Sequence, residues 1–331
     1  MKKFLSLLMA VMMMATVLAG CGGEKKDDSP APEATDTDTV AVGAVVIARD
    51  DVPEEDVYTF VSTIFENAET ITGQHAKGAE LDLEFASSVT SVPYHPGAAK
   101  YFEEKGFSVA SVKEGAGTGE SKSLTFGTGG ESGTYYAFGG VLSSYVSNNT
   151  DVSVTAVTSD GSKANIEDLA SGNVQLAFVQ SDVMSYAYNG ERLFDTPVEG
   201  FSVVANLYME QVQIVTTNPD IKSVADLKGK KVSIGAAGSG VYFNAIDVLG
   251  VYDMTEDDIK AVYQSFGDSA DSLKDGKIDA AFIVAGAPTT AVVDLATAGN
   301  VYLVSLDEGH SASLLEASPY YSAYTIPAGT Y

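Results

Sequence analysis

Cysteine, histidine and basic residues are scarce in this chain of 331 residues. There is one cysteine, Cys21, there are three histidines, and 19 Lys and Arg face 45 Asp and Glu, a formal net charge of −26. A lone cysteine forms neither an internal disulfide nor a multi-cysteine metal site. Because nucleic-acid phosphates repel so acidic a chain, the charge excludes a nucleic-acid-binding protein.

The histidines add no catalytic or metal signature. His75, His95 and His310 lie far apart without metal-ligand spacing, and His310 is expected at the surface or near a hinge. We therefore expect no metal and no cofactor. With 45% hydrophobic residues the chain can bury substantial cores, and its length suggests about two domains.

The N-terminus has the pattern of an export signal. Lys2 and Lys3 precede an apolar run over residues 4–18, too short to span a bilayer. The Leu-Ala-Gly-Cys ending at Cys21 resembles the bacterial lipobox, whose cysteine is diacylated and becomes the mature N-terminus. The alternative, a buried helix from Met1, lacks a packed continuation after Gly20. We expect a signal peptide over 1–20, a tether over 21–35 and lipidation of Cys21, at the extracytoplasmic face of the cell membrane.

The remaining chain alternates strands and helices after a polar stretch, residues 24–39, that predicts a solvated spacer. A strand is expected over 40–48, and helices near Pro53 and Pro96, where proline suits the first turn. Residues 108–123, rich in Gly, Ser, Lys and Glu, predict a flexible linker. Further strands are expected over 124–127, 152–158, 176–179, 201–206, 212–217, 231–234, 261–263, 280–283 and 301–304, with helices from Thr134, near Lys163 and from Ser181. Repeated β-α units predict parallel sheets covered by helices.

Two loops rich in glycine and small residues each follow a predicted strand and open a helix. They cover residues 128–134 and 235–241. Helix N-termini at the carboxyl ends of parallel strands offer free N–H groups and a positive dipole end. Ser132, Thr134 and Ser239 add hydroxyls. The loops lack the third glycine of a dinucleotide fingerprint, the phosphate-loop Gly-Lys-Ser/Thr and the nucleophile-elbow pattern; the alternative for each is a plain structural turn.

Charged and aromatic residues outside these loops refine the expected ligand. The chain has two arginines, neither in the loops, so a carboxylate ligand would be held without a guanidinium clamp. Arg192 is expected at the surface. Glu210 would meet an ammonium group if the ligand carries one, and its alternative role is a cap at the hinge. Of Tyr135 and Tyr136, one is expected to meet the ligand and the other to pack in the core.

Six motifs occur in the order seen in TAXI-type solute receptors of TRAP transporters, and the similarity runs from about Leu124 to Tyr331. The motifs are residues 127–136, 179–182, 207–210, 223–230, 235–240 and 286–288. This resemblance implies an α/β, type II periplasmic binding protein fold, with two α/β domains joined by two crossing strands and the ligand in the cleft. The lack of a loop arginine departs from other TRAP receptors but agrees with the TAXI branch.

The segment before the linker resembles the C-terminal part of that family. Residues 40–48, 54–67 and 93–102 carry this similarity, and residues 324–331 resemble the stretch that normally runs on into them. A circular permutation accounts for this order, with the usual tether now internal, and a chimeric or misassembled gene is the alternative. A permutation requires Tyr331 to lie within a few residues' reach of residues 36–40.

The resemblance implies domain I from residues 36–107, 124–211 and 305–331, and domain II from residues 212–304. Strand ends and loops expected to face the cleft supply the candidate ligand-binding residues. These are Thr128, Gly129, Ser132, Gly133, Thr134, Tyr135, Gln180, Ser181, Tyr208, Glu210, Gly238, Ser239, Gly240, Val241, Gly286 and Pro288.

The function that the resemblance implies is that of a solute receptor. It would close over a small anionic or zwitterionic ligand, such as glutamate, glutamine or a dicarboxylate, and deliver it to a TRAP-type membrane permease. One alternative is a ligand-sensing subunit of a membrane signalling system. An enzyme on the same scaffold is another, against which stands the lack of a nucleophile–base pair or a cofactor motif.

Overall fold

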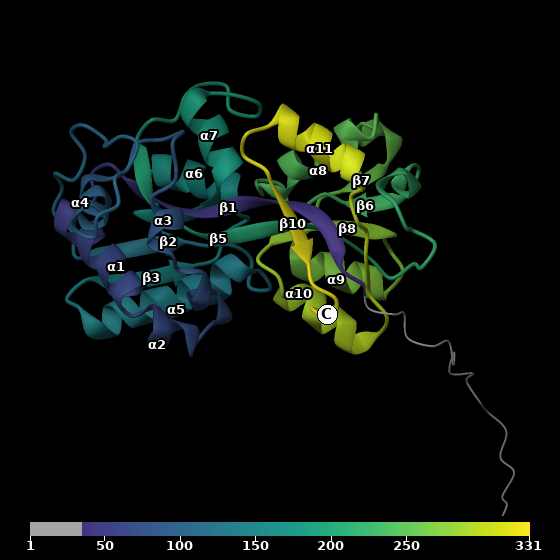
Figure 1. Ribbon diagram of the computed structural model, residues 1–331, viewed down its shortest axis with the longest axis horizontal. Helices are drawn as coiled ribbons and strands as arrows, with labels where there is room; N and C mark the ends of the chain where they lie inside the picture. Colours follow the sequence, from purple (N-terminus) through teal and green to yellow (C-terminus); the bar gives the residue numbers. More distant parts are fainter. Residues whose placement is uncertain (1–34) are drawn as a thin grey trace, which may run out of the picture. The chain divides into compact units, whose positions relative to one another are not determined.

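The computed structural model describes residues 35–331 and builds them around one mixed sheet (Figure 1). The predicted signal peptide (1–20), Cys21 and nearly all of the tether (21–35) lie outside the described residues. No helix within residues 35–331 combines the length and apolar character needed to cross a membrane. The strands are β1 (Thr37–Arg49), β2 (Ser123–Gly127), β3 (Ser153–Val157), β4 (Leu176–Gln180), β5 (Phe201–Thr216), β6 (Lys231–Ser233), β7 (Lys260–Val262), β8 (Ala280–Ala285), β9 (Tyr302–Leu303) and β10 (Ser322–Ile326).

The strand order divides the sheet into two lobes. It runs β3-β2-β4-β1-β5-β8-β6-β7, with β10 beside β1 and β9 beside β5. The first lobe is residues 44–209, around one hydrophobic core, and the second lobe is residues 37–42 and 211–331, with a core on each face of its sheet. The predicted α/β class, with two lobes joined by two strands, is confirmed.

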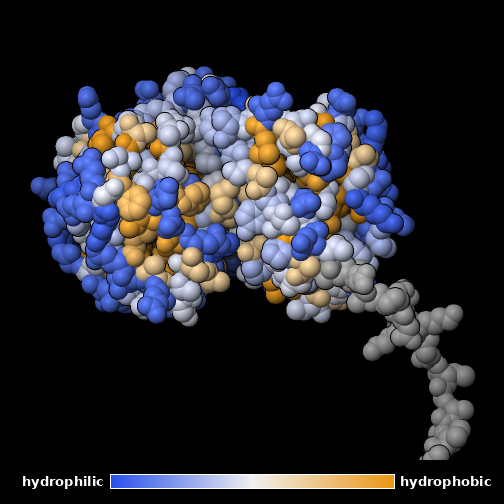
Figure 2. Space-filling model, viewed as in Figure 1, coloured by the Kyte–Doolittle hydropathy of each residue, from blue (hydrophilic) through white to orange (hydrophobic). Residues whose placement is uncertain are grey.

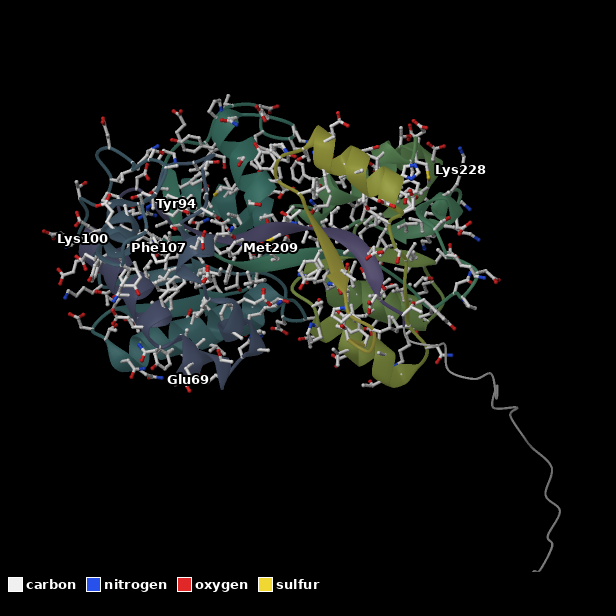
Figure 3. The ribbon with its side chains drawn as sticks, viewed as in Figure 1. Glu69, Tyr94, Lys100, Phe107, Met209 and Lys228 are labelled. Atoms are coloured by element: carbon white, nitrogen blue, oxygen red, sulfur yellow. The ribbon has the colours of Figure 1, made fainter. Side chains whose placement is uncertain are left out.

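The antiparallel strands β1 and β5 carry the chain between the lobes. They pair from Ala41↔Gln211 to Arg49↔Phe201, and β5 is buried along its length except at Met209, which Figure 3 labels midway along the strand. Such continuous burial is typical of a central strand covered on both faces. The sequence predicts two strands over 201–206 and 212–217, but residues 208–211 also pair with β1, so the structure has one.

Helices cover both faces of the first lobe's sheet. β2, β3 and β4 are parallel, as predicted, and β4 pairs antiparallel with the second half of β1. In Figure 1, α1 (Glu54–Glu66) and α5 (Thr134–Asn149) lie on one side, and α6 (Ser162–Ala170) and α7 (Ser181–Asn189) on the other. Short elements complete the lobe: α2 (Ala68–Thr72), η1 (Ala76–Glu80), α3 (Leu83–Ala86) and α4 (Pro96–Glu104).

The helices predicted from proline are confirmed. α1 follows Pro53 and has three acidic residues in its first turn, which suit the positive end of the helix dipole. α4 begins at Pro96, and the ring of His95 caps it by accepting a 3.3 Å hydrogen bond from the Gly97 N–H. His95 is fully buried, and this capping role explains the buried histidine.

The second lobe repeats the layered arrangement. β6, β7 and β8 are parallel, and β8 pairs antiparallel with β5. One face is covered by α8 (Val241–Val251) and α11 (Glu308–Ala317), the other by α9 (Phe266–Lys274) and α10 (Thr290–Ala298), as Figure 1 shows. The 3-10 turns η2 (Val224–Leu227) and η3 (Glu256–Asp258) lie in the connecting loops.

The C-terminal segment, residues 305–331, packs with the second lobe and not with the first as expected. Leu306, Leu314 and Tyr321 belong to the core that holds Ile214 and Val248. The reason is that β10 pairs with the beginning of β1, before β1 crosses into the first lobe.

The two ends of the described chain are neighbours. Thr37 pairs with Ile326, and the Ala328 N–H donates a 2.8 Å hydrogen bond to the Asp36 carboxylate. The expected proximity of the C-terminal residues to residues 36–40 is therefore confirmed. The prediction of a solvated spacer over residues 24–39 is wrong for its last residues, because β1 begins at Thr37. Thr39 is buried and donates a hydrogen bond to the Val212 carbonyl at 2.6 Å.

Residues 108–122, expected as a flexible linker, contain no helix or strand but are held along the first lobe. The Lys113 N–H donates to the Tyr94 carbonyl at 2.8 Å, and the Gly117 N–H donates to the Asp50 carbonyl at 2.8 Å. Lys113 Nζ also donates to the Glu199 carbonyl at 2.6 Å. Ser123, placed in the linker by the sequence, begins β2.

The neighbouring chain ends generate a test of connectivity. A rearranged chain that joins Tyr331 to Asp36 through a short Gly/Ser linker and opens between Glu120 and Ser121 should fold. We expect its free energy of unfolding in urea to lie within about 1 kcal/mol of the parent, since closing a short surface loop costs little.

A chain with the same join but opened between Met209 and Glu210 is the matched control. This opening interrupts β5 where it crosses between the lobes, so cooperative unfolding should be lost. Loss of cooperative unfolding in the first rearranged chain would contradict the arrangement described for β1 and β10.

Candidate functional site

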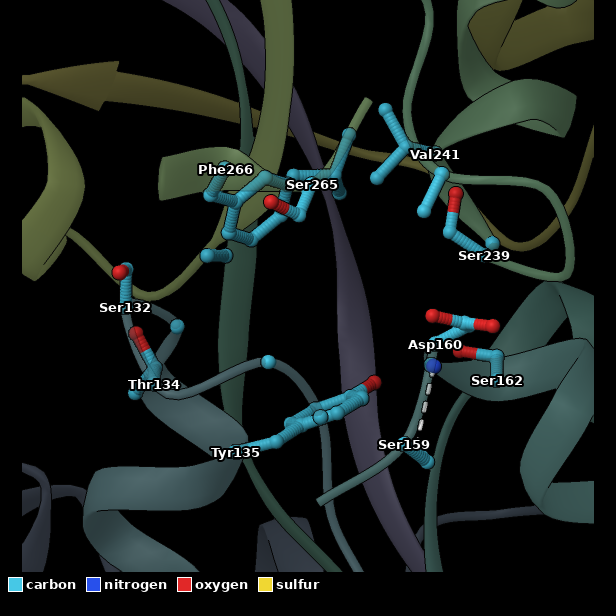
Figure 4. Close-up of a pocket in the computed structure, with 18 of the residues that line it drawn as sticks. Ser132, Thr134, Tyr135, Ser159, Asp160, Ser162, Ser239, Val241, Ser265 and Phe266 are labelled. Atoms are coloured by element: carbon cyan, nitrogen blue, oxygen red, sulfur yellow. Dashed lines mark hydrogen bonds between the residues drawn. The ribbon is translucent and has the colours of Figure 1, made fainter. Parts of the chain in front are cut away.

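A cavity of about 130 Å³ lies between the lobes, at the carboxyl ends of the parallel strands. Hydroxyl, carboxylate and aromatic side chains from both lobes surround it (Figure 4). The residues that line it are Gly129, Gly130, Glu131, Ser132, Gly133, Thr134, Tyr135, Ser159, Asp160, Gly161, Ser162, Gln180, Glu210, Ala236, Ser239, Gly240, Val241, Ser265, Phe266, Gly267, Val284 and Ala285.

Four helices begin at the cavity wall. α5 and α6 come from the first lobe and α8 and α9 from the second, and the first residue of each, Thr134, Ser162, Val241 and Phe266, lines the cavity. The first N–H groups of a helix have no partner within the helix, and the helix dipole makes this end positive. Convergence of four such ends creates a place for an anionic group.

Glycine at two helix starts is required by the local geometry. Gly161, which precedes α6, has φ 110°, a left-handed value that disfavours other residues. Gly240, which precedes α8, lies so close to Gln180 that a Cβ atom there would be 1.3 Å from Gln180 Oε1. The glycines therefore let the loops approach the cavity and each other.

The charged residues at the cavity are acidic. Glu131, Asp160 and Glu210 line it, and no Lys or Arg of residues 35–331 does. An anionic group bound here would contact amide N–H and hydroxyl donors, whereas a cationic group would contact carboxylates. No group of three or more His, Cys, Asp and Glu in the described part of the chain is placed to hold a metal ion.

Glu210 is buried on β5 at the crossing between the lobes. Tyr135 donates its hydroxyl to Glu210 Oε2 at 2.5 Å, and its ring stacks on Phe178 with centroids 4.7 Å apart. Burial raises the pKa of Glu210 well above its usual value, although the Tyr135 hydrogen bond and the charge of Lys77 oppose the rise. A cationic ligand group beside Glu210 would favour the ionised carboxylate.

Two buried polar atoms at the cavity lack a partner. Gln180 Oε1 and Ser239 Oγ make no hydrogen bond within residues 35–331, and their residues are only 2% and 8% exposed. Buried polar groups are normally paired, so these two are available to a bound ligand or water.

The comparison with protein families settles the relationship of the chain. The NMT1-like family matches residues 26–106 and 126–331, which together make up most of the sequence. The chain belongs to the NMT1-like family. The unmatched residues 107–125 coincide with the segment held along the first lobe.

Solved structures similar to this NMT1-like protein include periplasmic binding proteins. The alkanesulfonate-binding protein SsuA of Xanthomonas axonopodis pv. citri, bound to MOPS, is 20% identical, with a TM-score of 0.40, over 63% of this chain and 66% of that one. The Escherichia coli aliphatic sulphonate-binding SsuA is 19% identical, with a TM-score of 0.37, over 64% and 63%. An ancestral arginine-binding protein bound to arginine is 18% identical, with a TM-score of 0.40, over 59% and 92%. The chain thus spans less than two thirds of the length of either SsuA.

Ten of the sixteen candidate residues line the cavity of the NMT1-like protein. Tyr135 is the member of the tyrosine pair that reaches it, while Tyr136 does not. The ten are Gly129, Ser132, Gly133, Thr134, Tyr135, Gln180, Glu210, Ser239, Gly240 and Val241.

Three candidates point into the protein instead. Thr128 is buried and donates to the Val157 carbonyl at 2.6 Å, so it holds the end of β2 to β3. Ser181 accepts a 3.0 Å hydrogen bond from the Gly43 N–H on β1. Tyr208 is fully buried, edge-on to Phe138 and Phe178.

The other three candidates border the cavity without lining it. Gly238 lies in an outer groove beside Tyr263. Gly286 accepts a 2.9 Å hydrogen bond from Thr134 Oγ1 across the lobes and packs under Lys77, and Pro288 follows in the same loop. These positions shape the wall from behind.

The sequence analysis missed two of the four helix starts. Residues 159–162 (Ser-Asp-Gly-Ser) and 265–267 (Ser-Phe-Gly) line the cavity. The signal was present, because both follow predicted strands and contain glycine and hydroxyl residues before a helix. Phe266 gave no such signal, because an aromatic residue after a strand predicts a position in the hydrophobic core.

Arg192 is exposed, as the sequence predicts, but it also makes a contact that the sequence does not show. Its guanidinium, on the first lobe, makes a 2.8 Å ion pair with Asp247 on α8 of the second lobe, and its side chain is 28% exposed. His310 is partly exposed, as expected, but lies on the second lobe away from the hinge, where it stacks on Tyr252.

A buried carboxyl beside the cavity generates a pH prediction. Burial raises the pKa of Asp182 from 3.8 to about 7, and the charge of Asp247 adds to this. The folded chain therefore retains a proton that the unfolded chain releases between about pH 4 and 7, and the free energy of unfolding contributed by this group falls as the pH rises.

Asp182→Asn should remove this fall in the free energy of unfolding. We expect its free energy of unfolding, relative to the parent, to increase from pH 4 to 7 by at most about 4 kcal/mol, since one pKa unit is about 1.4 kcal/mol. Urea titrations across this range measure it. Asp226→Asn is the control, and its difference from the parent should stay nearly constant over this range, because hydrogen bonds from Lys222 and Ser223 lower the pKa of Asp226 below 3.8 and its contribution to stability is lost only at lower pH. A pH-independent difference for Asp182→Asn would contradict the assignment.

Proposed function

We propose that this NMT1-like protein is an extracytoplasmic, lipid-anchored solute receptor of the TAXI type that delivers a small carboxylate to a TRAP-type membrane permease. The observation that carries the proposal is the convergence of four helix N-termini, two from each lobe, on one cavity. A ligand there would touch both lobes at once, which is the condition for a ligand to favour the closed form.

The donors at the cavity fit a carboxylate. The helix starts supply amide N–H groups, and Ser132, Thr134, Ser162 and Ser239 supply hydroxyls, so the negative charge is held without a basic side chain. The carboxylates of Asp160 and Glu210 would accept hydrogen bonds from an ammonium group. Glutamate, glutamine or a dicarboxylate-like acid is the proposed ligand class, as the TAXI resemblance implies.

The cavity favours binding over catalysis. Its hydroxyls are not paired with a histidine, because His75, His95 and His310 all lie outside the lining residues. The proposed activity is therefore ligand capture by closure of the lobes, with no chemical step.

Two further proposals concern the N-terminal part of the chain: the lipid anchor at Cys21 and the circular permutation. Cys21 would carry the lipid, and the following residues would connect it to β1 in the second lobe. The pairing of β1 with β10 and the neighbouring chain ends support a permuted order, since a short turn from Tyr331 to Asp36 would make an ordinary hairpin.

Ligand binding should raise thermal stability. L-glutamate, L-glutamine or succinate at 100 times its Kd adds about 2.7 kcal/mol, which is an upward shift of a few degrees at this size. Differential scanning fluorimetry of the full chain carrying Cys21→Ser measures the shift.

Ser239→Tyr, which fills the cavity, should abolish the shift and leave the ligand-free melting temperature within a few degrees. Ser144→Tyr, on the exposed face of α5, is the matched control and should keep the shift. A shift that persists in Ser239→Tyr would remove the cavity from the ligand site, and the absence of a shift with any small acid would contradict the ligand class.

A further inference from the structure

A chain of hydrogen bonds leads from the cavity to the rim between the lobes. Gln180, at the cavity, donates from Nε2 to Asn244 Oδ1 at 2.7 Å. Asn244 Nδ2 donates to Asp182 Oδ2 at 2.9 Å and to the Tyr321 hydroxyl at 2.8 Å. Asn244 and Asp182 are fully buried, so these contacts are shielded from solvent.

The chain continues to an ion pair at the rim. The Tyr321 hydroxyl donates to Asp247 Oδ2 at 2.9 Å, and Arg192 Nη1 donates to the same oxygen at 3.0 Å. The Arg192 guanidinium lies 5.0 Å from the ring centroid of Tyr186 and 5.3 Å from that of Phe243. Flanking aromatic rings displace water and strengthen the attraction between opposite charges.

These contacts join the two lobes. Gln180, Asp182 and Arg192 belong to the first lobe, whereas Asn244, Asp247 and Tyr321 belong to the second. Among the ion pairs within residues 35–331, only Arg192–Asp247 connects the lobes.

The remaining direct contacts across the cavity are between neutral groups. Thr134 Oγ1 donates to the Gly286 carbonyl at 2.9 Å, and the Ala164 N–H donates to the Gly238 carbonyl at 3.0 Å. Hydrogen bonds between charged groups are about twice as strong as neutral ones. The ion pair is therefore the one contact between two charged side chains, among those within residues 35–331, that opening of the lobes must break.

We infer that Arg192 and Asp247 form a latch that keeps the lobes closed without ligand, and that Asn244 is the positioning residue that links the latch to Gln180 in the cavity. The latch restrains opening from the rim. Asn244 holds Gln180 with its Oε1 facing Gly240, ready for a ligand. Ligand occupancy and latch closure then stabilise the same arrangement.

The distance between the lobes tests the latch without any ligand. Spin labels on Lys100→Cys and Lys228→Cys, in the full chain with Cys21→Ser, report it by double electron–electron resonance. Figure 3 shows these residues at opposite ends of the two lobes, and both are exposed. The parent should show one narrow distance distribution, and Arg192→Met or Asp247→Asn should add a longer one.

A set of variants distinguishes loss of the latch from a general loss of stability. The double variant Arg192→Met with Asp247→Asn should open no more than either single variant, and Arg192→Lys should restore part of the closed population. Lys105→Met is the matched control, because Lys105 also pairs with a carboxylate, Glu66, at 2.9 Å and lies over a tyrosine ring, but within the first lobe. It should leave the distances unchanged. If Arg192→Met does not fold, Asp247→Asn, which removes the other charge of the pair, takes its place.

A second measurement, of ligand binding, rests on the proposed function, whereas the distance measurement does not. Calorimetry with L-glutamate should show a Kd raised about tenfold in Arg192→Met and about tenfold in Asn244→Ala, with the Lys105→Met value unchanged. A parent that is open without ligand, or unchanged distances in Arg192→Met and Asp247→Asn, would overturn the latch even if glutamate binds. A failure of glutamate to bind, with the distances as expected, would overturn the proposed ligand and leave the latch supported.

Discussion

The pairing of β1 with β5 is the constraint on which the rest of the structure depends. Both strands run through both lobes and stay paired, with two shifts of register between Ala44 and Ile47, so the two halves share a single sheet. Each helix that opens onto the cavity follows a strand of this sheet, and its N-terminus is placed by the strand before it. Glu210, the buried carboxylate of the site, lies on β5 opposite Val42 at the crossing itself. The position of the cavity is thus a consequence of where two strands leave one lobe and enter the other. The face in view in Figure 2 is hydrophilic along the outer margins of the lobes and carries hydrophobic patches nearer its middle.

The cavity combines a positive and a negative environment without a basic side chain. One helix N-terminus stabilises a negative charge by about 0.3–1 kcal/mol, and by up to about 2 kcal/mol where it is partly buried. Burial raises the pKa of Glu210 well above its usual value, which weakens the repulsion between this carboxyl and an anionic group held by the four helix ends. Asp160 and Glu131 remain as acceptors at the same cavity. The account therefore places an anionic group at the helix starts and reserves the carboxylates for donors on the ligand.

Much of this arrangement could be predicted from the sequence, because it is encoded locally. Gly129 and Ser132, in a loop after a strand, predict a helix start, and ten of the sixteen candidate residues line the cavity. What could not be predicted depends on contacts between distant segments. Thr128 and Ser181 carry the same hydroxyls as their neighbours but bond to the sheet, a choice made by the direction of one side chain. Arg192 is exposed, as predicted, but its ion pair with Asp247 forms only when folding brings the two residues together, and residues 305–331 join the second lobe because β10 pairs with the beginning of β1.

The central claim is that helix starts of both lobes bind one small carboxylate. Backbone ¹H–¹⁵N NMR of the labelled chain, titrated with L-glutamate, tests it most directly, since each amide reports its own contact. The account predicts the largest shifts at the amides of Thr134, Ser162, Val241 and Phe266 and their immediate neighbours, saturating together in both lobes. Shifts confined to one lobe, or centred away from these four helix starts, would contradict it.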